Sequence, residues 1–356
     1  MWRDVEKVAL IYAEEYLKHE TGRHIERASR LIRTLEVLEN AKIYEDRIVE
    51  ILKPRRALEE EVLEVHSENL LSRIRSLASM GGGRIAPDTV VSKYSYDVAL
   101  LAAGGGLRAL ELVSGEFFKR VFVLCRPPGH HAEHDRAKGF CLINNIAVTA
   151  KKALKMGFKR VLILDFDSHH GDGTQKIFYE DPNVVYASIH QDGRTLYPRT
   201  GDFREVGVGE GEGYKINIPL PPGSTGTMAF ECLKEVILPI MEEYRPEMIL
   251  VSAGYDGHWH DKNSDLMYTT ETYYEFMREI VNCAKKVNEG KIITLLEGGY
   301  DLKYMPYSIL RTLEAMSESS NWITLERDPK LNTAEKRTVE ILIKKAKKVL
   351  SKYWNI

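Results

Sequence analysis

The stretch VLILDFDSHHGDG, residues 161–173, decides the fold, because it joins a buried strand to a dense cluster of charged side chains. Four apolar residues in a row are typical of a strand that is covered on both faces in a parallel sheet. Alternate residues of an extended segment point to the same side, so Asp167 and His169 can bind one ion without a special turn. The stretch therefore predicts a strand that ends at a metal site.

Similar apolar runs recur along the chain and alternate with helical patterns, which predicts an α/β fold with a parallel sheet covered by helices on both faces. The charged, periodic region 24–75 predicts outer helices, so the run at 121–125 would be the first buried strand. A helix at 333–353 should pack on the outside, where it could also contact a second subunit. We expect strands at residues 121–125, 161–166, 183–189, 248–253 and 291–296, and helices at 95–116, 144–156, 227–244, 270–288 and 333–353.

Polar or glycine-rich loops follow these strands. In parallel sheets ligands bind beyond the carboxyl ends of the strands, so all of these loops are candidate site loops. The glycine-rich segment 207–213 predicts a surface turn, and no Gly-Lys-Ser/Thr follows it, which argues against a phosphate-binding loop. The candidate loops are residues 126–131, 165–172, 188–190, 252–258 and 297–300.

The composition argues against several classes of protein. Fifty Lys and Arg residues against 52 Asp and Glu residues give a net charge of -2, so no excess of positive charge is available for nucleic acid or an acidic membrane. Four widely spaced Cys residues without a CxxC pair are typical of reduced thiols in the cytoplasm. The charged residues 1–6, and the lack of an apolar run of about 18 residues, argue against a signal peptide or membrane span. We therefore expect a soluble cytoplasmic protein.

Asp167, His169 and Asp256 are the candidate ligands of a divalent metal ion. Two carboxylates and one imidazole would neutralise the ion and leave a position open for water and substrate, as in catalytic zinc sites. Zn²⁺ is preferred, although this oxygen-rich set would also accept Fe²⁺ or Co²⁺. An ordinary turn is the alternative for Asp256, because it follows Gly-Tyr.

His130 and His131 follow a Pro-Pro-Gly turn at the end of a predicted strand. Asp165 and Asp172 are not needed as ligands, and a carboxylate behind each His would set its tautomer for general acid and base catalysis. Tyr300, which follows two glycines, could donate its hydroxyl to a developing oxyanion. Together these groups predict a hydrolase for a carbonyl substrate.

Structural roles compete with some of these functional ones. A helix cap is the alternative for Asp165, and a turn is the alternative for Tyr300. Isolated histidines are more often hydrogen-bonded structural residues than ligands, and the following are interpreted in that way: His19, His24, His66, His134 and His260.

Five motifs of the chain together resemble those of the zinc-dependent histone deacetylases, most closely the class II and acetylpolyamine amidohydrolase branch. The resemblance runs from about Asp88 to Asp301. It implies the arginase/deacetylase fold, with a single three-layer α/β/α catalytic domain over residues 1–356 and a mostly parallel central sheet. The motifs are RPPGHHA at 126–132, GFCLINN at 139–145, DFDSHHGDGTQ at 165–175, SAGYD at 252–256 and EGGY at 297–300.

The resemblance also implies a role for each residue. Asp167, His169 and Asp256 would bind zinc. His131 with Asp172 behind it would be the general base and acid, His130 with Asp165 its electrostatic partner, and Tyr300 the donor to the tetrahedral intermediate. Gly139, Phe140 and Tyr197 would line a tunnel for an aliphatic chain, where aromatic rings can enclose a methylene stem. Asp88 would hold the substrate backbone at the rim.

Family members also bind potassium behind the zinc site, largely through backbone carbonyls. The positions that match a first K⁺ site are Asp165, Asp167, His169, Ser188 and Ile189. Those that match a second K⁺ site are Phe178, Asp181, Val184 and Tyr214.

Three positions depart from the family pattern. His24-Ile25 lacks the Pro that usually follows this His, and Ser168 replaces a bulkier residue between two ligands. Asp261-Lys262 stands where Asp-Pro is usual, which leaves the neighbouring rim loop and the choice of substrate open.

The residues and the resemblance lead to one expected activity. We expect an amidohydrolase in which zinc-activated water removes an acetyl or short acyl group from an acetylated lysine of a peptide or protein, or from an acetylated polyamine. A catalytically silent binding module and a deacylase of another small metabolite are alternatives. An arginase-like enzyme with two metal ions would need further ligands in place of the Tyr300 loop. No direct contact with nucleic acid or membrane is expected.

Overall fold

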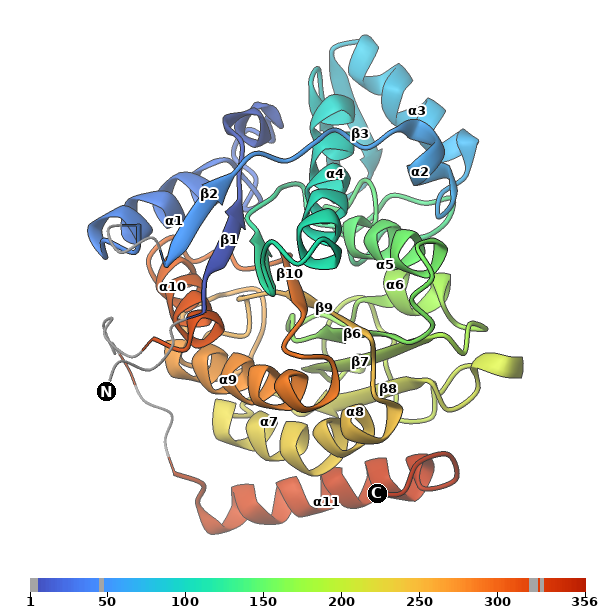
Figure 1. The fold of residues 1–356 in the computed structure, drawn as a ribbon, viewed down its shortest axis with the longest axis vertical. Helices are drawn as coiled ribbons and strands as arrows, with labels where there is room; N and C mark the ends of the chain where they lie inside the picture. Colours follow the sequence, from blue (N-terminus) through green and yellow to red (C-terminus); the bar gives the residue numbers. More distant parts are fainter. Residues whose placement is uncertain (1–5, 45–47, 320–325, 327–329) are drawn as a thin grey trace.

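The computed structural model describes residues 6–44, 48–319, 326 and 330–356 (Figure 1). Its main sheet has eight strands in the order β2-β1-β5-β10-β9-β6-β7-β8, and all neighbours in it are parallel. The charged start of the sequence, residues 1–5, lies outside the described residues. The strands are β1 Val8–Ile11, β2 Val49–Leu52, β5 Arg120–Val123, β6 Val161–Asp165, β7 Val184–Gln191, β8 Lys215–Leu220, β9 Met248–Ala253 and β10 Ile292–Leu296. A separate antiparallel hairpin joins β3 Gly82–Ala86 to β4 Thr89–Ser92.

Helices cover both faces of the sheet (Figure 1). On one face α4 packs on β5 and β10, and α5 packs on β6 and β9. On the other face α10 packs on β1 and β5 and is itself covered by α9 and α1. The helices are α1 Ser29–Asn40, α2 Glu59–Leu63, α3 Glu68–Ser79, α4 Ser95–Ser114, α5 Asn145–Lys155, α6 Asp172–Ile177, α7 Gly226–Cys232, α8 Leu238–Tyr244, α9 Thr270–Val287, α10 Tyr304–Ser317 and α11 Thr333–Leu350, with single turns η1 Glu14–Lys18 and η2 Gly209–Gly211 and the π-turn η3 Leu233–Ile237.

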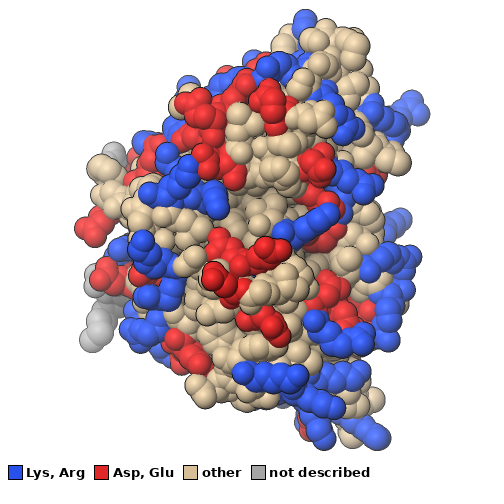
Figure 2. All heavy atoms as spheres, turned by 90° about the vertical axis from the view of Figure 1, so that its right-hand side faces the viewer, with Lys and Arg blue, Asp and Glu red and all other residues tan. Residues whose placement is uncertain are grey.

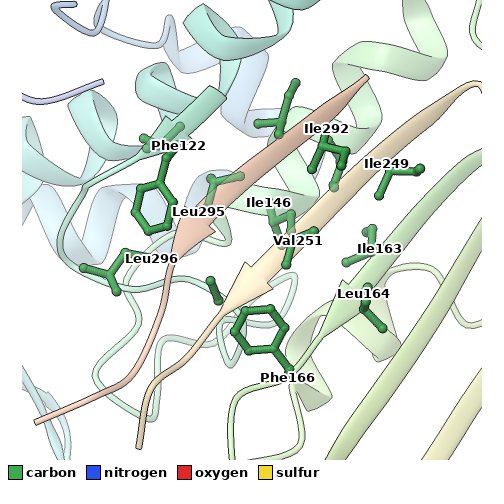
Figure 3. Close-up of a cluster of buried hydrophobic side chains, with 14 of the residues drawn as sticks. Phe122, Ile146, Ile163, Leu164, Phe166, Ile249, Val251, Ile292, Leu295 and Leu296 are labelled. Atoms are coloured by element: carbon green, nitrogen blue, oxygen red, sulfur yellow. The ribbon is translucent and has the colours of Figure 1, made fainter. Parts of the chain in front are cut away.

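The hydrophobic core lies between the middle strands and their helices. Figure 3 shows Phe122 of β5, Leu295 of β10, Val251 of β9 and Ile163 of β6 gathered in this core, with Ile146 of α5 among them. All five side chains are fully buried. Burial of so much apolar area on both faces of the sheet is the main favourable term in folding, and it fixes the ends of the strands in space.

The expected helix at the end of the chain is α11, which lies along the outside of the molecule (Figure 1). It packs on α7 and on the edge strand β8. Four of its apolar residues are buried: Val339, Leu342, Ala346 and Leu350. The helix is therefore a third layer over that edge of the sheet.

The prediction that residues 121–125 form the first buried strand is wrong. β1 precedes them in the chain, lies second in the sheet between β2 and β5, and is fully buried. The region 24–75 also contains β2, and the edge strand β8 was not predicted. β2 includes a Glu, and β8 includes a Lys, an Asn and a Pro, so neither gives a strong apolar signal, whereas β1 is an apolar run that was not assigned to a strand.

Strand order explains where the site forms. The chain places β5, β10, β9, β6 and β7 side by side, although they are far apart in the sequence. Because all strands are parallel, the loops that follow them meet at one edge of the sheet. Four of the five predicted site loops begin at the end of one of these strands, whereas residues 188–190, predicted as a loop, lie within β7.

Candidate metal centre and active site

Three ligand-type side chains converge beyond the carboxyl ends of β6 and β9. Asp167, His169 and Asp256 each offer one atom, and these atoms lie within 4.8 Å of one another. Nδ1 of His169 is 2.9 Å from Oδ2 of Asp256 and 3.2 Å from Oδ1 of Asp167. Both carboxylates are buried and His169 is half-buried. The structure thus brings together the three residues predicted as ligands, in a geometry that one divalent ion can bridge.

The electrostatics of this cluster favour a cation. Burial alone would lower the pKa of His169, but the carboxylates of Asp256 and Asp167 outweigh burial and raise that pKa to about 10. The backbone N–H of Gly298 donates to Oδ2 of Asp167 at 2.8 Å and fixes that carboxylate. A Cβ at Gly298 would lie 2.5 Å from Oδ2 of both Asp167 and Asp256, so only glycine allows this approach. The donor set fits Zn²⁺, with neighbours that hold the ligands in place.

Two His–Asp pairs lie beside the triad, and both histidines come from the loop after β5. Nδ1 of His130 is 3.0 Å from Oδ2 of Asp165, and Nδ1 of His131 is 2.9 Å from Oδ1 of Asp172. The two imidazole centroids are 4.0 Å apart. In each pair the Nδ1–H can donate to the carboxylate, which leaves Nε2 for proton transfer. Asp172 is also the first residue of α6.

The surroundings give the two imidazoles opposite proton affinities. Burial lowers the pKa of His130, but the charges of Asp165, Asp167 and Glu297 outweigh it and raise that pKa well above its usual value. For His131, burial and the neighbouring His130 lower the pKa to about 3, although Asp172 opposes them. His131 is therefore held neutral, as a base must be.

Lys138 is a cation of the site that the sequence did not single out. Its Nζ contacts Oδ2 of Asp172 and lies 2.7 Å from Oε1 of Glu133. Burial raises the pKa of Asp172, but its bonds to His131 and Lys138 outweigh burial and lower it. Asp172 is thus shared between the imidazole and the ammonium. The only signal for Lys138 in the sequence is its position directly before Gly139.

Residues predicted to grip the substrate surround this centre. Gly139 and Phe140 both have positive φ, of 56° and 68°, and a Cβ at Gly139 would lie 2.4 Å from the ring of His131. The ring of Tyr197 is 5.1 Å from that of His131 and 38% exposed. Asp88 accepts from the backbone N–H of Gly139 at 3.2 Å. All four predicted positions therefore lie close to the His pair.

Tyr300 lies beside Phe140. Its ring is 5.8 Å from that of Phe140. Burial raises the pKa of Tyr300 well above its usual value, so its hydroxyl keeps its proton and can donate. The backbone N–H of Tyr300 donates to Oδ2 of Asp261 at 2.6 Å. The departure at Asp261-Lys262 thus keeps the carboxylate that fixes the Tyr300 loop.

A buried ion network behind Tyr300 was missed by the sequence analysis. The guanidinium of Arg30 lies 5.0 Å from the Tyr300 ring centroid and donates to the carbonyl of Gly299 at 2.6 Å. Glu26 accepts from Arg30 at 3.2 Å and from both Nε and Nη2 of Arg126 at 2.8 Å. The i, i+4 spacing of Glu26 and Arg30 was the only signal in the sequence.

Glu297 holds the loop that carries the two histidines. Its Oε2 accepts from the backbone N–H of Gly129 at 2.6 Å and of His130 at 3.1 Å, and its Oε1 accepts from Ser252. Burial raises the pKa of Glu297 to about 7. The sequence placed Glu297 in a site loop but gave it no role.

The positions matched to potassium lie mainly on and around β6 and β7. Asp165 of β6 pairs with Ser188 of β7, so the predicted first set is contiguous. The hydroxyl of Ser188 is 2.8 Å from Nδ1 of His190. Around the second set, Lys215 donates to the carbonyls of Asp181 and Val184.

The histidines interpreted as structural have other partners. Nδ1 of His66 bonds the carbonyl of Glu133, and Nδ1 of His19 bonds the hydroxyl of Ser95. His134 bonds the carbonyl of Val65, and the ring of His260 stacks on Tyr304 at 4.2 Å. His24 differs, because its ring lies 4.5 Å from that of Phe140 at the edge of the site.

Comparisons with known proteins agree with this site. Residues 24–316 match the model of the histone deacetylase domain. A probable deacetylase of Archaeoglobus fulgidus is 41% identical over 97% of this chain and 98% of its own length. A histone deacetylase-like amidohydrolase of Pseudomonas aeruginosa is 34% identical over 73% of this chain and 69% of its own.

The chain belongs to the histone deacetylase family. A crystal structure of the HDA15 HD domain superposes with a TM-score of 0.87 at 30% identity, covering 98% of this chain and 95% of that one. The predicted arginase/deacetylase α/β fold is thus confirmed, and membership of the histone deacetylase family makes this protein a hydrolase. The histone deacetylase family is generally zinc-dependent, in agreement with the triad. No helix among the described residues is long and apolar enough to span a membrane.

Proposed function

We propose that this protein is a zinc-dependent deacetylase that removes an acetyl or short acyl group from an amine at the end of an aliphatic chain. Acetyl-lysine of a peptide or protein and an acetylated polyamine are the two substrate classes. The observation that carries the proposal is the convergence of three ligand atoms within 4.8 Å, next to two His–Asp pairs. A catalytic metal and a proton acceptor are the two requirements of amide hydrolysis by water.

The metal would be held by Asp167, His169 and Asp256. When bound, Zn²⁺ would supply a Lewis acid that polarises the substrate carbonyl and makes a water molecule more acidic. Among the described residues this is the only group of three metal-type ligands, which disfavours an arginase-like pair of ions. Ligands held by Gly298 and its neighbours would change position little when an ion binds.

Proton transfers would be carried out by His131. Its neutral Nε2 would accept the proton of the attacking water and later deliver it to the leaving amine, while Asp172 holds the ring in place. His130, with Asp165 and Asp167 on either side, would stay positively charged beside the developing negative charge. The protonated hydroxyl of Tyr300 would donate to the oxyanion of the tetrahedral intermediate.

Substrate recognition would rest on an apolar stem between aromatic rings. Phe140 and Tyr197 lie near the His pair and could enclose the methylene groups of the stem, with Gly139 leaving room for it. Asp88 holds the backbone of Gly139, so its rim role would combine with positioning of this loop. On the face shown in Figure 2, acidic and basic side chains are interspersed, which favours neither nucleic acid nor a charged tail as partner.

We further propose one catalytic domain over residues 1–356, because β1 is a strand of the main sheet and α11 packs on its edge strand β8, although both lie outside the matched residues 24–316. Its four cysteines are buried and free, which supports a reducing cytoplasm. A first K⁺ site at Asp165 and Ser188 and a homo-oligomer contact through α11 are parts of the same proposal.

Tyr300→Phe tests the proposed chemistry. It should lower kcat by at least about tenfold, because one oxyanion donor is lost, while zinc content stays unchanged. Tyr304→Phe, four residues further along, is the matched control and should keep its kcat. The substrate class is found by assaying acetyl-lysine peptides and acetylated diamines side by side. Equal kcat for Tyr300→Phe and wild type would reject the proposal.

A further inference from the structure

Lys215 is a buried cation that the proposed chemistry does not use. It is the first residue of the edge strand β8, and its side chain is fully buried. Its Nζ donates to the carbonyl of Val184 at 2.8 Å and to the carbonyl of Asp181 at 3.1 Å. An ammonium that donates to backbone carbonyls inside a protein is a structural cation rather than a solvated surface charge.

These two carbonyls belong to the set that the family resemblance assigns to a second potassium ion, together with those of Phe178 and Tyr214. The other two carbonyls have backbone donors, because Phe178 accepts from the N–H of Asp181 at 3.0 Å and Tyr214 accepts from the N–H of Tyr186 at 3.0 Å. The two carbonyls of the set that remain, those of Asp181 and Val184, accept hydrogen bonds from the ammonium of Lys215. The residues present do not fit a metal ion as well, because two positive charges would compete for the same oxygens.

The surroundings also suit an ammonium. Nζ of Lys215 lies 5.9 Å from the ring centroid of Tyr214, and the carboxylate of Asp181 adds negative charge. Trp354 packs against the residues that precede Lys215. Its ring is 5.6 Å from that of Tyr214, and its Nε1 donates to the carbonyl of Gly213. Burial lowers the pKa of Lys215 to about 7, so below neutral pH the ammonium is the main form.

We propose that the ammonium of Lys215 takes the place of the second potassium ion, so that this chain carries its own cation there and binds no metal ion at these carbonyls. The strand β8 and the turn at Asp181 would then be tied together by a covalently attached charge. Any potassium dependence of the protein would arise from the first site alone. This inference does not rest on the proposed deacetylase activity.

Crystals soaked in rubidium chloride at about pH 6 test this directly, because the anomalous signal of Rb⁺ locates monovalent cation sites. Three proteins are compared: wild type, Lys215→Ala, which removes the ammonium and leaves space, and Lys215→Met, which removes the charge but fills the space. We expect no Rb⁺ peak beside the carbonyls of Asp181 and Val184 in wild type or in Lys215→Met. We expect a peak there in Lys215→Ala.

The outcomes are decisive in each case. A peak beside these carbonyls in wild type overturns the proposal, and this soak remains decisive if neither variant folds. Absence of a peak in Lys215→Ala as well shows that the carbonyls are not a cation site, and also overturns it. In solution, KCl in place of tetramethylammonium chloride should raise the Tm of Lys215→Ala by at least about 2 °C more than that of wild type. Equal shifts would contradict the proposal.

Discussion

The two His–Asp pairs of the site have the same hydrogen-bond geometry, but the charged groups around them differ. Nδ1 lies 3.0 Å from the carboxylate in the pair His130–Asp165 and 2.9 Å in the pair His131–Asp172. Behind the first pair lie further carboxylates, those of Asp167 and Glu297, and the pKa of His130 is raised. Asp172 in the second pair is shared with the ammonium of Lys138.

This comparison teaches that a hydrogen-bonded carboxylate does not by itself decide the protonation of a histidine. The next layer of charge decides it, and here that layer pushes the pKa values of the two imidazoles in opposite directions. Two titratable groups separated in this way are typical of an acid and a base that work together. The comparison predicts unequal effects when either pair is changed.

The largest effect is expected for His131→Ala. Loss of the proton acceptor should lower kcat by at least about 100-fold, because general base catalysis typically accelerates a reaction by about 10² to 10⁴-fold. Zinc content, measured by elemental analysis, should not change, since His131 is not in the ligand triad. A kcat close to that of wild type would show that another group accepts the proton.

An intermediate effect is expected for His130→Ala. It removes a positive charge beside the reacting carbonyl but leaves the base in place, so kcat should fall by about tenfold, less than for His131→Ala. Measuring both variants on one acetylated substrate gives the ratio. The comparison of the two pairs would be wrong if His130→Ala lost as much activity as His131→Ala.

The smallest effect is expected for Lys138→Met. Without the ammonium, Asp172 acts more strongly on His131, and the pKa of His131 rises. The base is then protonated at a higher pH, so the acidic limb of kcat/KM should move up by about 1 pH unit while the plateau near pH 8 changes little. Lys176→Met is the control, because Lys176 contacts Glu133 from an exposed position. An unchanged acidic limb would show that Lys138 does not tune the pair.

The sequence predicts the ligands and both pairs because each of these residues lies at the end of a strong apolar run or in the loop that follows it. Asp167, His169 and Asp256 follow β6 and β9, and parallel strands place their ends together. The five strands β5, β10, β9, β6 and β7, and this edge of the sheet, could therefore be derived from periodicity and loop composition.

The layer behind these residues could not be derived in the same way. Glu26, Arg30 and Arg126 form one buried network from two distant segments, and Lys138 lies in a loop without periodicity. Such contacts depend on tertiary packing and not on a local pattern. β8 was missed for a related reason, because α11 and its neighbouring strand bury it although its sequence is partly polar, whereas β1 is an apolar run that was not assigned to a strand.

The central claim is that a single metal ion at Asp167, His169 and Asp256 works with the neutral His131. Zinc titration of chelator-treated protein, with deacetylation measured at each step, tests it most directly. Activity should rise from near zero in proportion to bound zinc and level off at about one ion per chain. Full activity without metal, or a plateau only at about two ions per chain, would contradict the account.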